Sequence, residues 1–127
     1  MNYQLNTGDL RVVSFAEFGD PSGTPVITCH GGPGSRLSPK RNAKEAAAAG
    51  FRLIVIDRPG LGESSRLPGR SIADWTNDGL AVADYLELKN FFVEGTSTGG
   101  SYSLATASLE PDRVLGVLVC CGMTDIS

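Results

Sequence analysis

Residues 95–100 read Gly-Thr-Ser-Thr-Gly-Gly, and this stretch decides how the rest of the chain is interpreted. An apolar run ends just before it at Val93, and a helix-like stretch begins just after it near Ser101. A serine at so sharp a strand-to-helix turn is forced towards positive φ, and side chains two residues to either side of it would collide with the strand and the helix. Glycine at positions 95 and 99 removes these collisions. The pattern therefore predicts a nucleophile elbow that presents the Ser97 hydroxyl at the carboxyl edge of a sheet.

A second glycine-rich loop, residues 30–35 (His-Gly-Gly-Pro-Gly-Ser), directly follows the short apolar run 25–29. Acyl transfer needs backbone N–H groups directed at the oxyanion of the tetrahedral intermediate, and removing one such donor typically costs about 2.7 to 4 kcal/mol of barrier. Because Pro33 has no N–H, we expect the donor from this loop to be Gly32, with Gly31 as the alternative. The second expected donor is the backbone N–H of Thr98, the residue after the nucleophile.

A third glycine-rich loop, residues 57–65, follows the apolar run 53–56, so three apolar strands end in three loops of this kind. Along the chain, apolar runs of strand length alternate with helical stretches, which predicts an α/β fold with a mostly parallel sheet of about six strands and helices on both faces. The expected strands are residues 3–5, 11–18, 26–29, 52–56, 91–94 and 114–121, and the expected helices are residues 39–49, 71–87 and 101–109.

Several side chains have a simpler interpretation than a role in chemistry. Trp75 lies at helical spacing with apolar neighbours, which favours a place in the core over one in a substrate pocket. The three cysteines fall in expected strands and are interpreted as small core residues, because neither disulfide nor metal-ligand spacing is present. A small group of cations is expected to form a solvated helix face: Arg36, Lys40, Arg41 and Lys44.

Composition describes an ordinary globular chain, with 41% hydrophobic and 20% charged residues and a formal net charge of −3. There is no basic stripe for a nucleic acid, no apolar run long enough to cross a membrane, and no signal-peptide start, so a cytoplasmic location is expected. A single histidine and the absence of a carboxylate cluster give no basis for a metal site. No phosphate-binding or dinucleotide fingerprint occurs, so no cofactor is expected.

The chain resembles the α/β-hydrolase family through HGGPGS at 30–35, DRPGLGESS at 57–65 and GTSTGG at 95–100. The resemblance covers essentially the whole chain and implies a serine hydrolase core. The HGGPG run also resembles prolyl iminopeptidases, which would imply cleavage of an N-terminal residue from a peptide. Those enzymes usually carry a glutamine-arginine pair after the aspartate and a tryptophan after the nucleophile, whereas this chain has Arg58-Pro59 and Thr98. A generic ester or amide hydrolase with a small-molecule substrate is therefore favoured over a peptidase.

The catalytic base is the element that this sequence lacks, because a serine hydroxyl becomes a good nucleophile only when a histidine takes its proton. In this fold the order is serine, acid, histidine, and no histidine follows Ser97. The resemblance implies a structural role for His30. Asp125 is a candidate acid in a minority arrangement, and its alternative is a loop carboxylate in solvent.

The expected organisation is accordingly a partial hydrolase core over residues 1–127, in which the late strands, the lid and two triad members are absent. Two alternatives stay open: a non-catalytic protein on the same fold, and an enzyme of this fold with other chemistry, such as a dehalogenase. The latter generally uses an aspartate where Ser97 stands. The strand expected at 114–121 would form a long apolar edge, which favours self-association.

Overall fold

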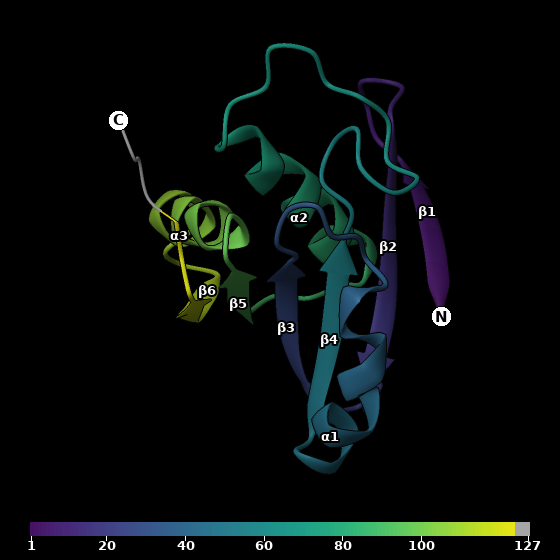
Figure 1. Cartoon of the computed structure of the whole chain (residues 1–127), viewed down its shortest axis with the longest axis vertical. Coiled ribbons are helices and arrows are strands. Elements are labelled where there is room, and N and C mark those ends of the chain that lie inside the picture. Colours follow the sequence, from purple (N-terminus) through teal and green to yellow (C-terminus); the bar gives the residue numbers. More distant parts are fainter. Residues whose placement is uncertain (124–127) are drawn as a thin grey trace.

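The computed structural model of the protein describes residues 1–123, which form one six-stranded sheet with helices on both faces (Figure 1). The strand order across the sheet is β1-β2-β4-β3-β5-β6. The strands span β1 Asn2–Asn6, β2 Val12–Gly19, β3 Thr24–Cys29, β4 Phe51–Ile56, β5 Phe91–Thr96 and β6 Val114–Cys120. All six expected strands are present within a few residues of their predicted bounds.

The sheet is mixed, with an antiparallel pair of strands at one side and parallel strands in the rest. β1 pairs with β2 and β2 with β4 in antiparallel fashion, whereas β3 pairs in parallel with both β4 and β5, and β5 with β6. In register, Cys29 at the end of β3 lies opposite Ile56 of β4 and Gly95 of β5. The three glycine-rich loops therefore leave the sheet at the same edge, which is where parallel strands present functional groups.

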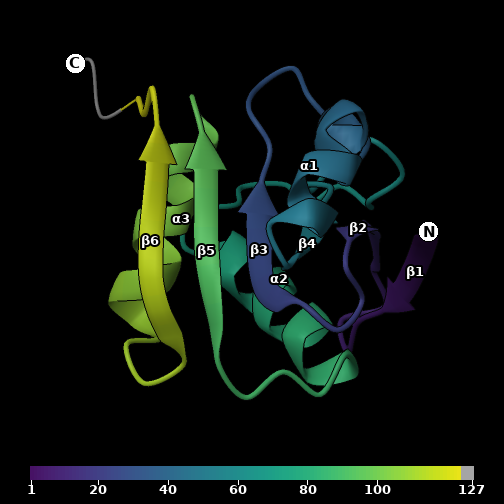
Figure 2. The same cartoon turned by 90° about the horizontal axis from the view of Figure 1, so that it is seen from below.

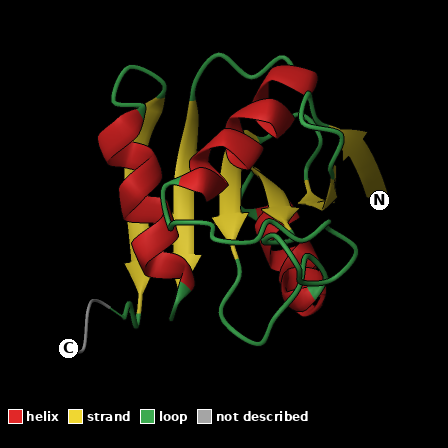
Figure 3. Cartoon of the chain, turned by 90° about the horizontal axis from the view of Figure 1, so that it is seen from above, coloured by secondary structure: helices red, strands yellow, loops and turns green. Residues whose placement is uncertain are grey.

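Within residues 1–123, three α-helices cover the sheet, and they divide unequally between its faces. They are α1 Ala43–Ala48, α2 Asp74–Tyr85 and α3 Gly99–Leu109, and a 3₁₀ helix, Ser38–Asn42, precedes α1. Viewed from above, α2 and α3 lie together on one face, and viewed from below, α1 lies on the other (Figures 2 and 3). The helix expected at 39–49 is thus a 3₁₀ turn followed by a short α-helix, and Leu37, which precedes the first turn, makes no side-chain cap bond.

The second helix, α2, begins at Asp74, three residues after its predicted start at Ser71. Ser71 and Asp74 cap each other reciprocally: Ser71 N–H and Oγ donate to Asp74 Oδ2 at 2.6 and 2.9 Å, and Asp74 N–H donates to Ser71 Oγ at 3.3 Å. Such a reciprocal pair satisfies the free N–H groups at a helix start. Ser71 is therefore the residue that caps the helix, and regular α-helix begins at Asp74.

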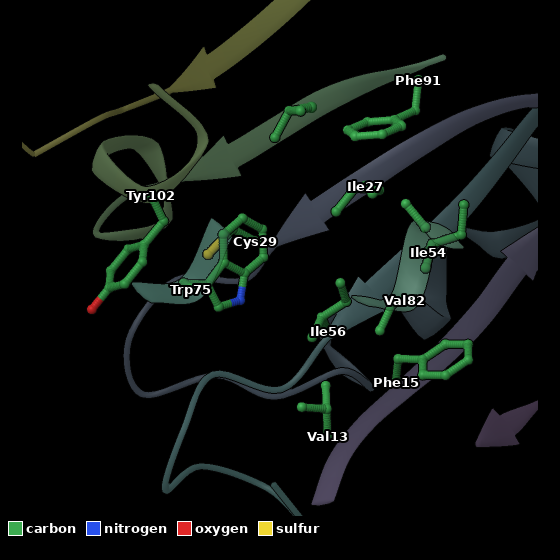
Figure 4. Packing of buried hydrophobic residues seen from close by; sticks show 12 residues of the cluster. Val13, Phe15, Ile27, Cys29, Ile54, Ile56, Trp75, Val82, Phe91 and Tyr102 are labelled. Carbon is green, nitrogen blue, oxygen red and sulfur yellow. The ribbon is translucent and has the colours of Figure 1, made fainter. Parts of the chain in front are cut away.

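The hydrophobic core lies between the sheet and the two helices α2 and α3 (Figure 4). Trp75 is fully buried there, with its ring edge-to-face against Tyr102 of α3 at a centroid distance of 6.1 Å. The core interpretation of Trp75 is confirmed. Of the cysteines, Cys29 is buried in this core, whereas Cys120 and Cys121 are exposed. The prediction of a buried core position was wrong for those two because β6 is an edge strand.

The opposite face of the sheet is only partly covered, because α1 contacts β2 and β4 and leaves β3, β5 and β6 open. A groove of about 740 Å³ runs over this open part and reaches Gly31 and Thr96 at the carboxyl edge. Within residues 1–123 no helix is long and apolar enough to cross a membrane.

Candidate active site

Ser97 lies in the left-handed region with φ +55°, at the junction of β5 and α3. This conformation costs a non-glycine residue roughly 1 to 2 kcal/mol, so the surroundings have to hold it. The Ser97 N–H donates to the carbonyl of Cys120 at 2.9 Å, and its carbonyl accepts from the N–H groups of Gly100 and Met123 at 3.0 and 3.2 Å. The serine backbone is thereby held between the helix start and the residues after β6. The expectation of positive φ at position 97 is met.

The glycines on either side of Ser97 are required by backbone contacts. A Cβ on Gly95 would lie 2.2 Å from the carbonyl oxygen of Gly99, and a Cβ on Gly99 would lie 2.1 Å from the carbonyl oxygen of Cys29. Both contacts are with main-chain atoms, which cannot swing away as a flexible side chain could. The elbow therefore packs directly on the end of β3, and the sequence reason given for the two glycines agrees with the structure.

The loop of residues 30–35 lies against the elbow, as the sequence predicts for an oxyanion loop. A Cβ on Gly31 would be 3.4 Å from Cβ of Ser97. The Gly32 N–H, the predicted donor, points at the Thr98 side chain and donates to its Oγ1 at 2.8 Å. An oxyanion bound by Gly32 would take the place of this hydroxyl. The convergence of the Gly32 and Thr98 backbone N–H groups on a substrate oxygen stays a prediction.

His30 links two loops through both of its ring nitrogens. Its Nδ1 lies 2.8 Å from the carbonyl of Gly31, and its Nε2 accepts from the Arg58 N–H at 3.4 Å. This pairing places the ring proton on Nδ1 of a neutral imidazole. His30 as a residue is 3% exposed, and burial lowers its pKa below the ordinary value of 6.5. Both nitrogens are engaged by the backbone, which agrees with a structural role rather than that of a general base.

Asp57 and Arg36 form a buried ion pair, which the sequence analysis did not predict. Asp57 is fully buried, and its carboxylate accepts from Arg36 N–H at 2.6 Å, Arg36 Nη1 at 2.7 Å and Glu63 N–H at 3.0 Å. The prediction that Arg36 belongs to a solvated helix face was wrong: the residue is 6% exposed and precedes the helix. The pair fastens the loop after β3 to the loop after β4. The sequence feature that could have indicated this ion pair is Asp57 itself, a carboxylate placed directly after the apolar run 53–56.

A second group missed from the sequence surrounds Tyr102 in the first turn of α3. The Arg58 guanidinium lies over the Tyr102 ring at 5.0 Å from its centroid, and its Nη1 donates to Thr98 Oγ1 at 3.3 Å. The Arg70 guanidinium lies 5.8 Å from the same centroid, and its Nη1 donates to the Tyr102 hydroxyl at 2.7 Å. Arg58 thus contacts both Thr98, the residue after Ser97, and Tyr102, whereas Arg70 contacts Tyr102. The last predicted site residue, Asp125, lies outside the described residues.

The comparisons with known proteins agree with this geometry. The alpha/beta hydrolase fold family matches residues 24–127, so the chain belongs to the α/β-hydrolase family. Its proline iminopeptidase relative from Neisseria gonorrhoeae is 32% identical over 118 residues, which cover 91% of this chain and 38% of the relative. Epoxide hydrolase B of Mycobacterium tuberculosis is 32% identical over 118 residues, which cover 90% of this chain and 33% of that protein.

Among solved structures, a thermophilic esterase from Thermogutta terrifontis superposes with a TM-score of 0.81 at 28% identity, covering 97% of this chain and 46% of the esterase. The first curated relatives are longer proteins, and the chain spans 31% to 38% of their length. These matches confirm the α/β-hydrolase fold and family that the three glycine-rich motifs indicated.

Proposed function

We propose that this chain carries the nucleophile side of a serine hydrolase that acts on an ester or amide bond through an acyl-enzyme at Ser97. The observation that carries the proposal is the positive φ of Ser97 at the β5–α3 junction, against the loop that contains Gly31 and Gly32. In the proposed reaction Ser97 Oγ attacks the substrate carbonyl, and the carbonyl oxygen becomes an oxyanion held by the backbone N–H groups of Gly32 and Thr98. Collapse of this intermediate expels the alcohol or amine, and water then releases the acid from the serine ester.

We assign no described residue as the general base. The only histidine of the sequence is His30, and the backbone occupies both of its ring nitrogens. We therefore propose that the histidine and the acid that complete the triad come from outside these 127 residues. The lengths of the curated relatives, of which this chain spans about a third, support this assignment.

The nucleophile type favours acyl chemistry over the epoxide hydrolysis in the name of one relative. A serine oxygen that opens an epoxide would leave an ether on the enzyme, and water does not readily cleave an ether. A serine oxygen that attacks a carboxylic ester or amide leaves an ester, which water can cleave. An aminopeptidase of the kind named by other relatives stays the second candidate, since its chemistry is also acyl transfer to serine.

The test supplies the base from solution. The chain is mixed with p-nitrophenyl acetate in the presence and absence of 2-methylimidazole, a base whose methyl group hinders its own attack on the ester. We expect a burst of nitrophenolate of about one equivalent per chain that requires the added base, because a triad without its histidine loses up to about a millionfold in turnover. Ser97→Ala should remove the burst, whereas Ser101→Ala, a matched change in the next turn, should keep it. A burst of equal size in the Ser97→Ala chain would overturn the proposal.

A further inference from the structure

Arg58 and Arg70, which both contact the Tyr102 ring, carry positive charge that no carboxylate balances within the described residues. The ion pairs of residues 1–123 involve Arg11, Arg36, Arg52 and Arg113, and neither Arg58 nor Arg70 is among them. Arg58 is 5% exposed, and its buried Nε has no hydrogen-bond partner in this part of the chain. Burying a guanidinium without a carboxylate costs free energy that a charged partner would recover.

The two guanidinium groups lie at the start of α3, where a positive charge is least favourable. The start of an α-helix is the positive end of its dipole and favours anions over cations. α3 has no acidic residue in its first turn, and Thr98 makes no side-chain cap bond. Both guanidinium groups nevertheless contact Tyr102 in that turn. Contact with an aromatic face offsets only part of the cost of burying a cation.

The hydrogen-bond donors of the same group converge on one oxygen atom. Thr98 Oγ1 accepts from Gly32 N–H at 2.8 Å and from Arg58 Nη1 at 3.3 Å, so a backbone donor and a guanidinium point to the same place. Gly32 is exposed and Thr98 is half-buried, which leaves this place open to solvent on the loop side. Rotation of the threonine side chain would free Gly32 N–H for the oxyanion of the proposed reaction, and it would free Arg58 Nη1 for a carboxylate of the substrate beside that oxyanion.

We propose that Arg58, supported by Arg70, forms an anion subsite beside Ser97 that binds the carboxylate of the substrate. The inference deepens the proposed function and rests on it: the substrates are esters or amides that carry a negatively charged group near the scissile bond. The same charge acts against substrates with a protonated amine at this place, since like charges repel. Among the candidates above, it therefore favours an acidic ester or amide over a peptide with a free amino terminus.

The test measures anion binding directly and does not depend on catalysis. The isotope-labelled chain is titrated with sodium acetate at constant ionic strength while the amide resonances of Gly32 and Thr98 are followed by NMR. We expect saturable shifts of both amides with acetate and none with acetamide or ethylammonium. Arg58→Met should weaken acetate binding at least about tenfold, which corresponds to about 1.4 kcal/mol, because a charge-assisted hydrogen bond is lost. Arg66→Met, which removes an exposed arginine from the same loop, should leave the binding unchanged.

Two further variants keep the proposal open to refutation if Arg58→Met does not fold. Arg58→Lys keeps the charge but loses the planar fork, and Arg70→Met removes only the supporting cation, so both should bind acetate more weakly than the wild type. Full acetate affinity in a folded Arg58 variant, or the absence of saturable shifts in the wild type, would overturn the anion subsite. Ser97→Ala should bind acetate as the wild type does. Failure of the nitrophenolate burst together with normal acetate binding would refute the proposed function alone.

Discussion

At the scale of single residues, the strained serine is held by contacts that only glycine permits on either side. The collision at Gly99 is with the carbonyl of Cys29, whereas a Cβ on Gly79 in the middle of α2 would meet nothing within 4 Å. Gly99→Ala should therefore destabilise the fold by about 1 to 3 kcal/mol, the usual cost of overpacking. Gly79→Ala should stabilise it by about 0.5 to 1 kcal/mol, since alanine is the better helix former. Urea unfolding of the two variants measures both changes in the free energy of unfolding. Equal changes would contradict the argument that a Cβ at position 99 collides with the Cys29 carbonyl.

His30 gives the fold a pH dependence of definite sign. Its pKa is lowered by burial in the folded state, so near its ordinary value of 6.5 the unfolded chain binds the proton more readily than the folded chain does. Stability should therefore fall as the pH drops below 6.5 towards the folded pKa. Unfolding free energies measured in urea at about pH 7.5 and about pH 5.5 should show this loss.

The matched variant for this test is His30→Asn, which keeps a donor for the Gly31 carbonyl but does not titrate. It should remove most of the loss between the two pH values. Carboxylates with lowered pKa values, such as Asp9 at about 2, titrate below this window and do not interfere. An unchanged pH dependence in His30→Asn would show that another group is responsible.

At the scale of the elements, the buried Asp57–Arg36 pair fixes two loops in the positions that the site requires. Removal of one partner from a buried pair costs about 3 to 5 kcal/mol, and without the Asp57 charge the buried Arg36 would keep only the exposed carboxylate of Glu63, at 2.8 Å, as an ion-pair partner. Asp57→Asn should show a loss of this size. Asp84→Asn is the control, because Asp84 pairs with Arg113 at 2.8 Å but its side chain is 67% exposed, and such pairs contribute about 0 to 1 kcal/mol. Comparable losses in the two variants, measured by chemical unfolding, would contradict this account of the loops.

β6 is the element that we expect to govern association. It is the last strand of the sheet, and its side chains Leu115 and Leu118 are each 59% exposed. A long apolar edge strand pairs readily with another chain, so the 127-residue chain should self-associate with rising concentration in size-exclusion chromatography with light scattering. Leu118→Lys, which lies opposite Glu94 in the register, should weaken this association. The same change at Leu104 on α3 should not, and a strictly monomeric wild type would refute the prediction.

The elements also show what the sequence could and could not predict. Strand positions, the elbow and its two glycines follow from apolar periodicity and backbone geometry, which are local properties. Arg36 was misplaced because its partner Asp57 lies 21 residues along the chain, and a long-range ion pair leaves no local pattern. The cluster around Tyr102 was missed for the same reason, since Arg58, Arg70 and Tyr102 come together only when β4, its loop and α3 are packed. Cys120 was expected to be buried because its strand is apolar on both faces, although the same strand was expected at the edge of the sheet, where a residue lacks a neighbouring strand on one side.

At the scale of the whole molecule, the chain combines a tightly connected edge around Ser97 with a sheet face that is only partly covered. The loops after β3 and β4 and the elbow after β5 are locked together by backbone contacts, a neutral histidine and a buried ion pair. Without a base, p-nitrophenyl acetate turnover by the chain alone should stay close to the uncatalysed rate, and His30→Ala should not change it. A robust rate that His30→Ala abolishes would make His30 the base and would contradict the role given to it here.

The most direct test of the central claim is to locate the acyl group on the protein. The chain is treated with p-nitrophenyl acetate and 2-methylimidazole, digested, and mapped by peptide mass spectrometry. We predict one acetyl group on Ser97, formed much faster than acetylation at any lysine or cysteine and absent from the Ser97→Ala chain. Acetylation of other residues at the same rate in both chains, with Ser97 unmodified, would contradict it.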